Sequence, residues 1–488
     1  MTDEYDIAVI GGGAAGLSAA QTAAAASKRV VLITSGELGG ECTWNGCVPS
    51  KALIEAARVC HTARRAADFG VRVPVVEVDF AAVMAHVQDA IARIAHYEDA
   101  AHLRAAGIDV RLGHARLANS HSIEVGDAVV EAARIVLCTG SRPSVPAIPG
   151  LDTVDFLTNE SVFALKQQPR RLLIIGAGPI GLELAQAFAR LGSAVHVIDV
   201  APQLLPREDP DVVRVIRAAF DREGVRFTLG AEITAVAPSA GTVRVSLVAG
   251  GADQTLEGDA LLVATGRAPN TDGLGLDRAG VKTKRTGIIV DEHLRTSLDG
   301  VYAAGDVTGI MPFTHVAAYQ GRLASTNAMG KRRKASYRVV PWAIFTDPEI
   351  AHVGLTEPEA RLQHGDDIRV STLPFTAVDR AVISRETQGL IKVITSGKPL
   401  IGHAAGGALL GAHIVGANAG ELIHEFAIGM QVHAFAGRLA QAIHAYPSMA
   451  VGVQQAVARL FAAGRASAGE LREDVDDLNS VGHPQLPP

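Results

Sequence analysis

Short apolar runs alternate with helical segments along much of the chain. Residues 6–10, DIAVI, predict a buried strand, residues 17–26, LSAAQTAAAA, the helix after it, and residues 29–33, RVVLI, a second strand. Residues 171–199 repeat the order of strand, helix and strand. Strands that alternate with helices in this way are typical of a parallel sheet. The pattern therefore predicts an α/β fold that contains two β-α-β units.

Each β-α-β unit carries three glycines between its first strand and its helix. With the spacing G-x-G-x-x-G, these are Gly11, Gly13 and Gly16 in the first unit, and Gly176, Gly178 and Gly181 in the second. This spacing permits a tight turn and lets a pyrophosphate approach the positive end of the helix. A later strand of each half also ends in a glycine, Gly140 and Gly266. Two such units, 165 residues apart, predict two dinucleotide-binding domains.

Two further segments have other patterns. Residues 79–94 predict a helix that packs on the core through apolar side chains at helical spacing, namely Phe80, Val83, Met84, Val87, Ile91 and Ile94. From about residue 340, strands and a helix without a glycine fingerprint predict an α+β domain. Residues 467–488 are acidic and then proline-rich, which predicts a flexible tail.

Composition narrows the class of protein. The chain has 488 residues, 48% of them hydrophobic and 20% charged, which suits a globular protein of several domains. A net charge of −6 argues against a nucleic-acid or membrane-surface binder. No apolar stretch reaches the roughly 18 residues of a membrane span, and the N-terminus lacks the basic segment of a signal peptide. We expect a cytoplasmic protein without nucleic-acid or membrane partners.

Two of the four cysteines, Cys42 and Cys47, lie in the segment GGECTWNGCVPSK at residues 39–51. Zinc requires about four ligands, but Cys60 and Cys138 are isolated in the sequence, so no metal site is predicted. A reducing compartment disfavours a structural disulfide. A helix N-terminus and a nearby cation would favour the reactive thiolate. The pair is best explained as a redox dithiol, with a crosslink and a metal site as weaker alternatives.

Together these motifs resemble those of a known family. The segments GGGAAG, GGECTWNGCVPSK, GAGPIGLE, ATGRAPN and VYAAGDVTG are similar to those of the flavin-dependent pyridine nucleotide–disulfide oxidoreductases, which include dihydrolipoamide dehydrogenase, glutathione reductase and mercuric reductase. The resemblance covers about residues 5–465. It implies that FAD binds at the first fingerprint, with Asp306 on its ribityl chain, and that a nicotinamide nucleotide binds at the second.

The resemblance also implies how the chain is divided. An FAD-binding domain would comprise residues 1–150 and 276–340, and an NAD(P)-binding domain residues 151–275. Residues 341–466 would form the interface of a homodimer, and residues 467–488 the tail.

Site residues follow from the same resemblance. Cys47 would contact the flavin and Cys42 would face the substrate, while Lys51 and Glu183 would form an ion pair beside the reactive nitrogen of the flavin. A cation at Lys51 would stabilise the reduced flavin and the thiolate. Asp199, 18 residues beyond Gly181, would bind the ribose 2′-hydroxyl and favour NADH over NADPH. The alternative for Asp199 is a carboxylate that caps a turn.

Two positions depart from the family pattern. The second strand ends near Thr34, where the family places an acidic residue for the adenosine ribose. In IHAYPSMAVG, Tyr446 occupies the place of the proton-shuttling histidine, Val451 that of its glutamate partner, and His444 lies two residues earlier. The ordinary pKa of tyrosine exceeds that of histidine by about 3.5 units, or nearly 5 kcal/mol. Tyr446 is therefore predicted to be a poor proton shuttle, and His444 is the candidate replacement.

These features predict an enzyme that passes electrons from NAD(P)H through FAD and the Cys42–Cys47 pair to a small-molecule or metal-ion acceptor. The segments DRAVISRETQGLIKVI and AGELI and the tyrosine at position 446 look more like mercuric reductase than like the disulfide reductases, although the last residues, GHPQLPP, hold no cysteine pair. A metal or quinone reductase is therefore the preferred hypothesis. The alternatives are dihydrolipoamide dehydrogenase or another disulfide reductase, and an FAD-binding interaction protein without catalytic activity.

Overall fold

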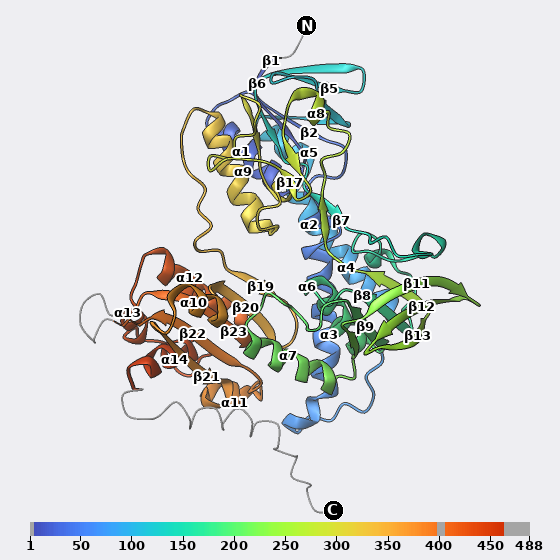
Figure 1. Ribbon diagram of the computed structural model, residues 1–488, viewed down its shortest axis with the longest axis vertical. Coiled ribbons are helices and arrows are strands. Elements are labelled where there is room, and N and C mark those ends of the chain that lie inside the picture. The colour runs from blue at the N-terminus through green and yellow to red at the C-terminus, as the bar shows by residue number, and fades with distance from the viewer. Residues whose placement is uncertain (1–3, 398–405, 463–488) are drawn as a thin grey trace, which may run out of the picture. The chain divides into compact units, whose positions relative to one another are not determined.

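A computed structural model describes residues 4–397 and 406–462, and they form two compact units (Figure 1). Unit 1 comprises Met1–Leu204 and Glu223–Ser336, and unit 2 comprises Leu205–Arg222 and Tyr337–Pro488. The α/β class is confirmed. The finer division of unit 1 into FAD-binding and NAD(P)-binding parts stays a prediction, and the predicted tail at residues 467–488 lies outside the described residues.

The first sheet of unit 1 has the strand order β3-β2-β1-β6-β5-β4, and β18 also pairs with β6. Its central strands are parallel, whereas β4 and β5 add an antiparallel edge. The strands are β1 (Glu4–Ile10), β2 (Val30–Thr34), β3 (Ile108–Leu112), β4 (Ala115–Leu117), β5 (Ser122–Val125), β6 (Ala128–Leu137) and β18 (Val301–Ala303). The predicted order of strand, helix and strand is thus present at the start of the chain.

Two helices, α1 (Ala14–Ala25) and α9 (Thr314–Ala328), pack against each other beside this sheet (Figure 1). Their close approach depends on small residues at the contact. A Cβ atom at Gly321 of α9 would lie only 2.1 Å from the carbonyl oxygen of Ala15 in α1. The alanine-rich sequence of α1 buries Ala15, Ala19, Ala20 and Ala23 and so allows a second helix to lie against it.

The second β-α-β unit builds the parallel sheet β10-β9-β8-β14. Its elements are β8 (Arg171–Ile175), α6 (Pro179–Leu191), β9 (Ala194–Asp199), β10 (Arg226–Leu229) and β14 (Ala260–Val263). Beside it lies an antiparallel sheet of β11 (Glu232–Ser239), β12 (Thr242–Ala249) and β13 (Ala252–Gly258). The ribbon β7 (Ser141–Pro143) and β15 (Arg267–Pro269) pairs the two segments that follow β6 and β14.

The predicted helix at residues 79–94 is α4 (Phe80–Ala95), which packs on α3 (Cys47–Arg64). Its core-facing side is Phe80, Met84, Val87 and Ile91, all buried. The expectation was wrong for Ile94, which is 41% exposed because the last turn of α4 extends beyond the core contact.

Unit 2 contains the α+β domain predicted from residue 340. Its antiparallel sheet has the order β19-β20-β23-β22-β21. The strands are β19 (Trp342–Ile344), β20 (Glu349–Gly354), β21 (Ile368–Pro374), β22 (Leu390–Ser396) and β23 (Leu409–Gly416). The helices of this unit are α7 (Pro210–Arg222), α10 (Glu357–His364), α11 (Asp379–Ser384), α12 (Ala419–Gln431), α13 (Ala436–Ala440) and α14 (Ala450–Ala462). Within the described part of the chain, no helix has the length and apolar character needed to cross a membrane.

The α1–α9 contact gives a first prediction. We expect Gly321→Ala to destabilise the protein by about 1–3 kcal/mol, because overpacking forces the two helices apart. Thermal unfolding followed by circular dichroism measures this loss. Gly420→Ala in α12 is the matched control, since its Cβ would meet the nearest atoms at an ordinary 3.5 Å. Equal melting temperatures for the two variants would contradict the packing argument.

Candidate functional site

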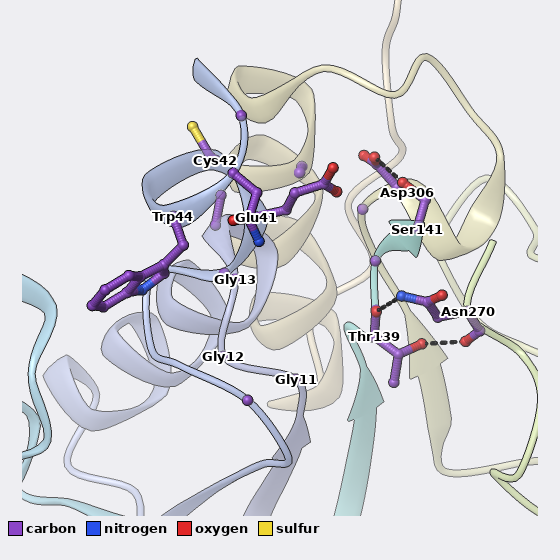
Figure 2. Close-up of a pocket in the computed structure, with 18 of the residues that line it drawn as sticks. Gly11, Gly12, Gly13, Glu41, Cys42, Trp44, Thr139, Ser141, Asn270 and Asp306 are labelled. Atoms are coloured by element: carbon purple, nitrogen blue, oxygen red, sulfur yellow. Dashed lines mark hydrogen bonds between the residues drawn. The ribbon is translucent and has the colours of Figure 1, made fainter. Parts of the chain in front are cut away.

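A cavity of about 860 Å³ in unit 1 opens at the carboxyl ends of β1, β2 and β6 (Figure 2). Its walls include the first glycine fingerprint, the segment from Cys138 to Ser141, Asp306 and both cysteines of the pair. Ligands of open α/β sheets bind at this edge, and the volume lies in the range of about 300–1,000 Å³ that is usual for cofactor sites. The cavity therefore brings the first glycine fingerprint and the dithiol to one place.

The glycines of the first fingerprint have distinct structural reasons. A Cβ atom at Gly11 would lie 2.1 Å from the carbonyl oxygen of Cys138, and one at Gly16 would lie 1.8 Å from that of Gly11. Gly13 instead lines the cavity, at the N-terminus of α1. In the described structure no side chain caps α1 and its first turn holds no acidic residue. The N–H groups of that turn thus suit the pyrophosphate of a dinucleotide such as FAD.

The second fingerprint repeats this geometry. A Cβ at Gly176 would lie 2.3 Å from the carbonyl oxygen of Ala264, and one at Gly181 would lie 2.0 Å from that of Gly176. Gly178 has open space beside it and begins α6, again without a side-chain cap among the described residues. The N-terminus of α6 therefore fits a second dinucleotide in the same way.

Gly140 and Gly266 lie just after β6 and β14, where the backbone adopts a positive φ angle. Their φ angles are +71° and +122°, and no neighbouring atom of the described residues lies within 4 Å of a Cβ built at either position. Glycine is required there by the positive φ, which other residues adopt only with strain.

Asp199, at the end of β9, is bound to the main chain. Its Oδ2 accepts a hydrogen bond of 2.5 Å from the N–H of Ala177, and its Oδ1 accepts one of 2.8 Å from the N–H of Ala201. These bonds support the alternative of a turn-capping carboxylate. Each carboxylate oxygen can accept a further hydrogen bond, so the ribose role stays a prediction.

Thr34 does not supply the missing acidic side chain. Its hydroxyl donates a hydrogen bond of 3.0 Å to the carbonyl oxygen of Gly36, in the loop after β2. The exposed Glu37 of the same loop lines the cavity. Glu37 therefore places a carboxylate in the wall of the cavity, in the loop after β2.

Asp306 belongs to a polar network on one wall of the cavity (Figure 2). Its Oδ2 accepts a hydrogen bond of 2.6 Å from the hydroxyl of Ser141, which in turn accepts one of 2.8 Å from Nε of Arg267. Arg267 also forms an ion pair with Glu41, the residue before Cys42. We missed Ser141, Arg267 and Glu41 as site residues, because they lie in three separate motifs and no spacing in the sequence links them.

Cys42 lies in α2 (Gly40–Trp44) and Cys47 begins α3, both as free thiols. A hydrogen bond from Cys42 lowers the pKa of Cys47 to about 6, helped by Thr314 and by the charge of Lys51, against burial and Glu183. The same hydrogen bond, together with burial, raises the pKa of Cys42. The hydroxyl of Thr314, in α9, lies 3.5 Å from the sulfur of Cys47. The two thiols are therefore unequal, and Cys47 carries the negative charge.

Lys51 and Glu183 form the predicted ion pair. The Nζ atom of Lys51 donates a hydrogen bond of 2.8 Å to Oε2 of Glu183, which is only 5% exposed. The pair joins α3, the helix of the cysteines, to α6, the helix of the second fingerprint. It therefore positions a cation in the cavity wall one turn along α3 from Cys47.

His444 and Tyr446 belong to unit 2 and have different partners. Nε2 of His444 lies 2.9 Å from Oε2 of Glu425 in α12. Burial lowers the pKa of His444, but its bonds to Glu425 and to the carbonyl of Ala442 outweigh burial, so the pKa is raised. We missed Glu425 as its partner because it lies 19 residues away in the sequence.

Tyr446 is 72% exposed, and its hydroxyl donates a hydrogen bond of 2.8 Å to Asp379. This bond raises the pKa of Tyr446. A tyrosine in this state is a weaker acid than an ordinary one and is still less ionised near neutral pH, so it stays a poor proton shuttle, in line with the sequence argument. The catalytic roles of both residues stay predictions.

The structure holds two glycine cradles, each made of a glycine fingerprint and the helix N-terminus that follows it, and a pair of cysteines in which Cys47 has a lowered pKa. Together these features define a dinucleotide-dependent oxidoreductase. Residues 5–321 match the family model described as pyridine nucleotide-disulphide oxidoreductase, and residues 340–457 match the model of its dimerisation domain. The chain therefore belongs to the pyridine nucleotide–disulfide oxidoreductase family. The predicted family, the enzyme class and the presence of an FAD-binding and a dimerisation domain are confirmed, whereas the domain boundaries stay predictions. The second match supports the predicted homodimer.

Relatives with different activities are similarly close. A mercuric reductase of Lysinibacillus sphaericus is 36% identical over 456 residues, covering 93% of this chain and 82% of that protein. A dihydrolipoyl dehydrogenase of Chlamydia muridarum is 35% identical over 456 residues, covering 92% and 95%. Among solved structures, the Cu(II) complex of the HOCl-induced flavoprotein disulfide reductase RclA from Escherichia coli matches with a TM-score of 0.83 and 30% identity, covering 94% and 100%.

The unequal thiols give a second prediction. In reduced protein, we expect iodoacetamide to alkylate Cys47 with a midpoint near the pKa of about 6, because only the thiolate reacts. Lys51→Met should raise that midpoint by about one unit, since it removes a nearby positive charge. Mass spectrometry across a pH series identifies the modified cysteine. Lys28→Met is the control on an exposed lysine, and a lower midpoint for Cys42 than for Cys47 would show that Cys42 is the thiolate instead.

Proposed function

We propose that this protein is an NADH-dependent flavoenzyme that passes electrons through Cys42 and Cys47 to a soft metal ion or a quinone. The observation that carries the proposal is the stabilised thiolate of Cys47, which lies in the same cavity as the glycine cradle of α1. The mercuric reductase relatives support the metal as acceptor, because they span almost the whole of this chain.

Bound FAD supplies hydride acceptance from the nicotinamide and two-electron reduction of a disulfide. The first-turn N–H groups of α1 would hold its pyrophosphate, and Asp306, oriented by Ser141, would accept hydrogen bonds from its ribityl hydroxyls. After reduction, Cys42 keeps a proton and Cys47 keeps the negative charge, which Lys51 and Thr314 stabilise. The protein thus stores two electrons as one thiol and one thiolate.

The preference for a metal ion or a quinone follows from Tyr446. A disulfide substrate needs a proton donor for its departing thiolate, and Tyr446 is a poor proton shuttle. A soft metal ion needs no proton donor, because the two sulfurs close to a disulfide as they pass two electrons to the ion, and Cys42 releases its proton to solvent. A quinone draws its two protons from solvent.

A disulfide reductase is the second candidate, and the His444–Glu425 pair is the observation that favours it. A histidine whose pKa is raised by a carboxylate resembles a general acid–base group. Dihydrolipoyl dehydrogenase relatives of similar identity support the same candidate.

Two substitutions separate these candidates. We expect Tyr446→Phe to lower turnover of a metal ion or quinone about threefold to tenfold. The substitution removes one hydrogen bond that the Tyr446 hydroxyl would donate at the acceptor site, and such a bond contributes about 0.5–1.5 kcal/mol. His444→Gln should change that turnover less than about twofold. Anaerobic reoxidation of NADH-reduced enzyme by mercuric ion, cupric ion, a quinone, lipoamide and oxidised glutathione measures both. His364→Gln, on an exposed position of α10, is the control.

One outcome would favour the second candidate. If His444→Gln lowers turnover of lipoamide or glutathione disulfide by about 10² to 10⁴, the usual contribution of general acid–base catalysis, and spares the metal ions, the enzyme is a disulfide reductase.

Nucleotide preference gives a separate prediction. We expect kcat/KM to be at least about tenfold higher for NADH than for NADPH, because Asp199 repels a 2′-phosphate. Asp199→Ser should reduce the ratio of kcat/KM for NADH to kcat/KM for NADPH. It should also lower the melting temperature, because Asp199 accepts hydrogen bonds from the N–H groups of Ala177 and Ala201. Asp253→Ser in the exposed strand β13 is the control. A native enzyme that prefers NADPH would disprove the assignment of Asp199.

A further inference from the structure

Unit 2 contains a buried cluster of ionisable side chains that the proposed redox function does not use. His352 on β20 and His413 on β23 are direct partners across the two strands, and their ring centroids are 4.2 Å apart. Glu208, two residues before α7, joins them. His352 is 2% exposed, His413 is 0% exposed and Glu208 is 7% exposed. Polar groups at this depth need partners.

Main-chain carbonyl groups fix both imidazole rings. Nε2 of His352 donates to the carbonyl oxygen of Gly354, and Nε2 of His413 donates to that of Leu355, each at 2.9 Å. In a neutral imidazole the other nitrogen then carries a lone pair. Metal-binding histidines are commonly oriented in this way, through an N–H bond to a carbonyl oxygen. Both rings therefore present Nδ1 as the available ligand atom.

The Nδ1 atom of His413 is buried and has no hydrogen-bond partner among the described residues. An unsatisfied buried polar atom costs about 1–3 kcal/mol. The lone pair of this nitrogen therefore lacks an electrophile among the described residues.

Glu208 is held in place beside the two rings. Its Oε1 accepts a hydrogen bond of 2.8 Å from the indole N–H of Trp342, while its Oε2 lies 3.1 Å from Nδ1 of His352. A carboxylate oxygen and an imidazole lone pair attract each other only through a shared proton or cation. One ligand atom from each of Glu208, His352 and His413 lies within 4.8 Å of the others.

Among the described residues, the lysine and arginine side chains near Glu208 pair with other carboxylates. The buried ammonium of Lys392 contacts Asp209, Asp211 and Glu357 at 2.9, 2.8 and 2.6 Å. Its charge is therefore shared among three other carboxylates. The side chains of Arg214 and Arg361, which pair with Asp211 and Glu357, are more than half exposed. A divalent cation would balance the remaining charge at Glu208.

We propose that Glu208, His352 and His413 bind a zinc ion through one carboxylate oxygen and two Nδ1 atoms. Imidazole and carboxylate are ligands that Zn²⁺ favours, at about 2.0–2.2 Å. The ion would join β20, β23 and the segment before α7 within unit 2. The sequence predicted no metal site because these residues have no ligand spacing, and Glu208 and His352 alone lie 144 residues apart.

Zinc affinity tests the proposal. We expect tag-free protein, with Cys42 and Cys47 oxidised so that no thiolate competes, to bind about one Zn²⁺ per chain in competition with a chromophoric chelator. His413→Gln and His352→Gln should each weaken binding at least about a hundredfold. His102→Gln is the matched control, because His102 belongs to the exposed group of His96, Asp99 and His102. Loss of zinc in His102→Gln alone would overturn the proposal.

X-ray absorption at the zinc edge gives a readout that needs no variant. We expect imidazole and oxygen ligands at about 2.0–2.2 Å and no sulfur. A sulfur shell at about 2.3 Å would assign the ion to cysteine instead. Wild-type protein that binds no zinc tighter than about 100 µM would also overturn the proposal, whether or not the variants fold. It would show that a proton between His352 and Glu208 replaces the ion.

Discussion

The ion pair of Lys51 and Glu183 is the contact on which the organisation of unit 1 depends. It ties α3, which begins at Cys47, to α6, which begins at the second glycine cradle. Glu183 is buried and Lys51 is half-buried, so replacing Lys51 would leave a buried carboxylate without its cation, which is destabilising. The pair also brings a positive charge that favours the thiolate of Cys47. One interaction thus serves the packing of the two helices and the chemistry of the cysteine.

Close contacts between backbone atoms explain why the glycine cradles were predictable from the sequence. At both fingerprints the first glycine meets a carbonyl oxygen of the neighbouring loop, and the third meets the carbonyl of the first. A side chain at either position would collide, so local sequence spacing fixes local geometry. The predicted strand at residues 6–10 agrees with β1 (Glu4–Ile10) for the same reason, because its pattern is set by the neighbours within the strand.

Interactions between distant residues were not predictable in this way. Arg267 and Glu41 lie 226 residues apart, and Glu425 lies 19 residues before His444. No period or motif spacing encodes such a pair, because the fold brings the partners together. The same limit applies to Ile94, whose apolar spacing indicated burial although the last turn of α4 extends past the core. Sequence therefore predicted the glycine cradles and the cysteines and, through the family resemblance, Lys51, Glu183 and Asp306. It did not predict the partners Ser141, Arg267, Glu41 and Glu425.

In unit 2, packing contacts connect the buried cluster of Glu208, His352 and His413 to the helix that holds His444, a candidate determinant of the electron acceptor. His352 and His413 lie on β20 and β23, and both strands pack against α12. Helix α12 carries Glu425, which holds His444. An ion at the cluster would fix the register of the two strands and thereby the position of α12, which packs against both. The pKa of His444 depends on that helix, because Glu425 supplies the opposing charge. A structural metal in this unit would thus influence proton transfer without taking part in it.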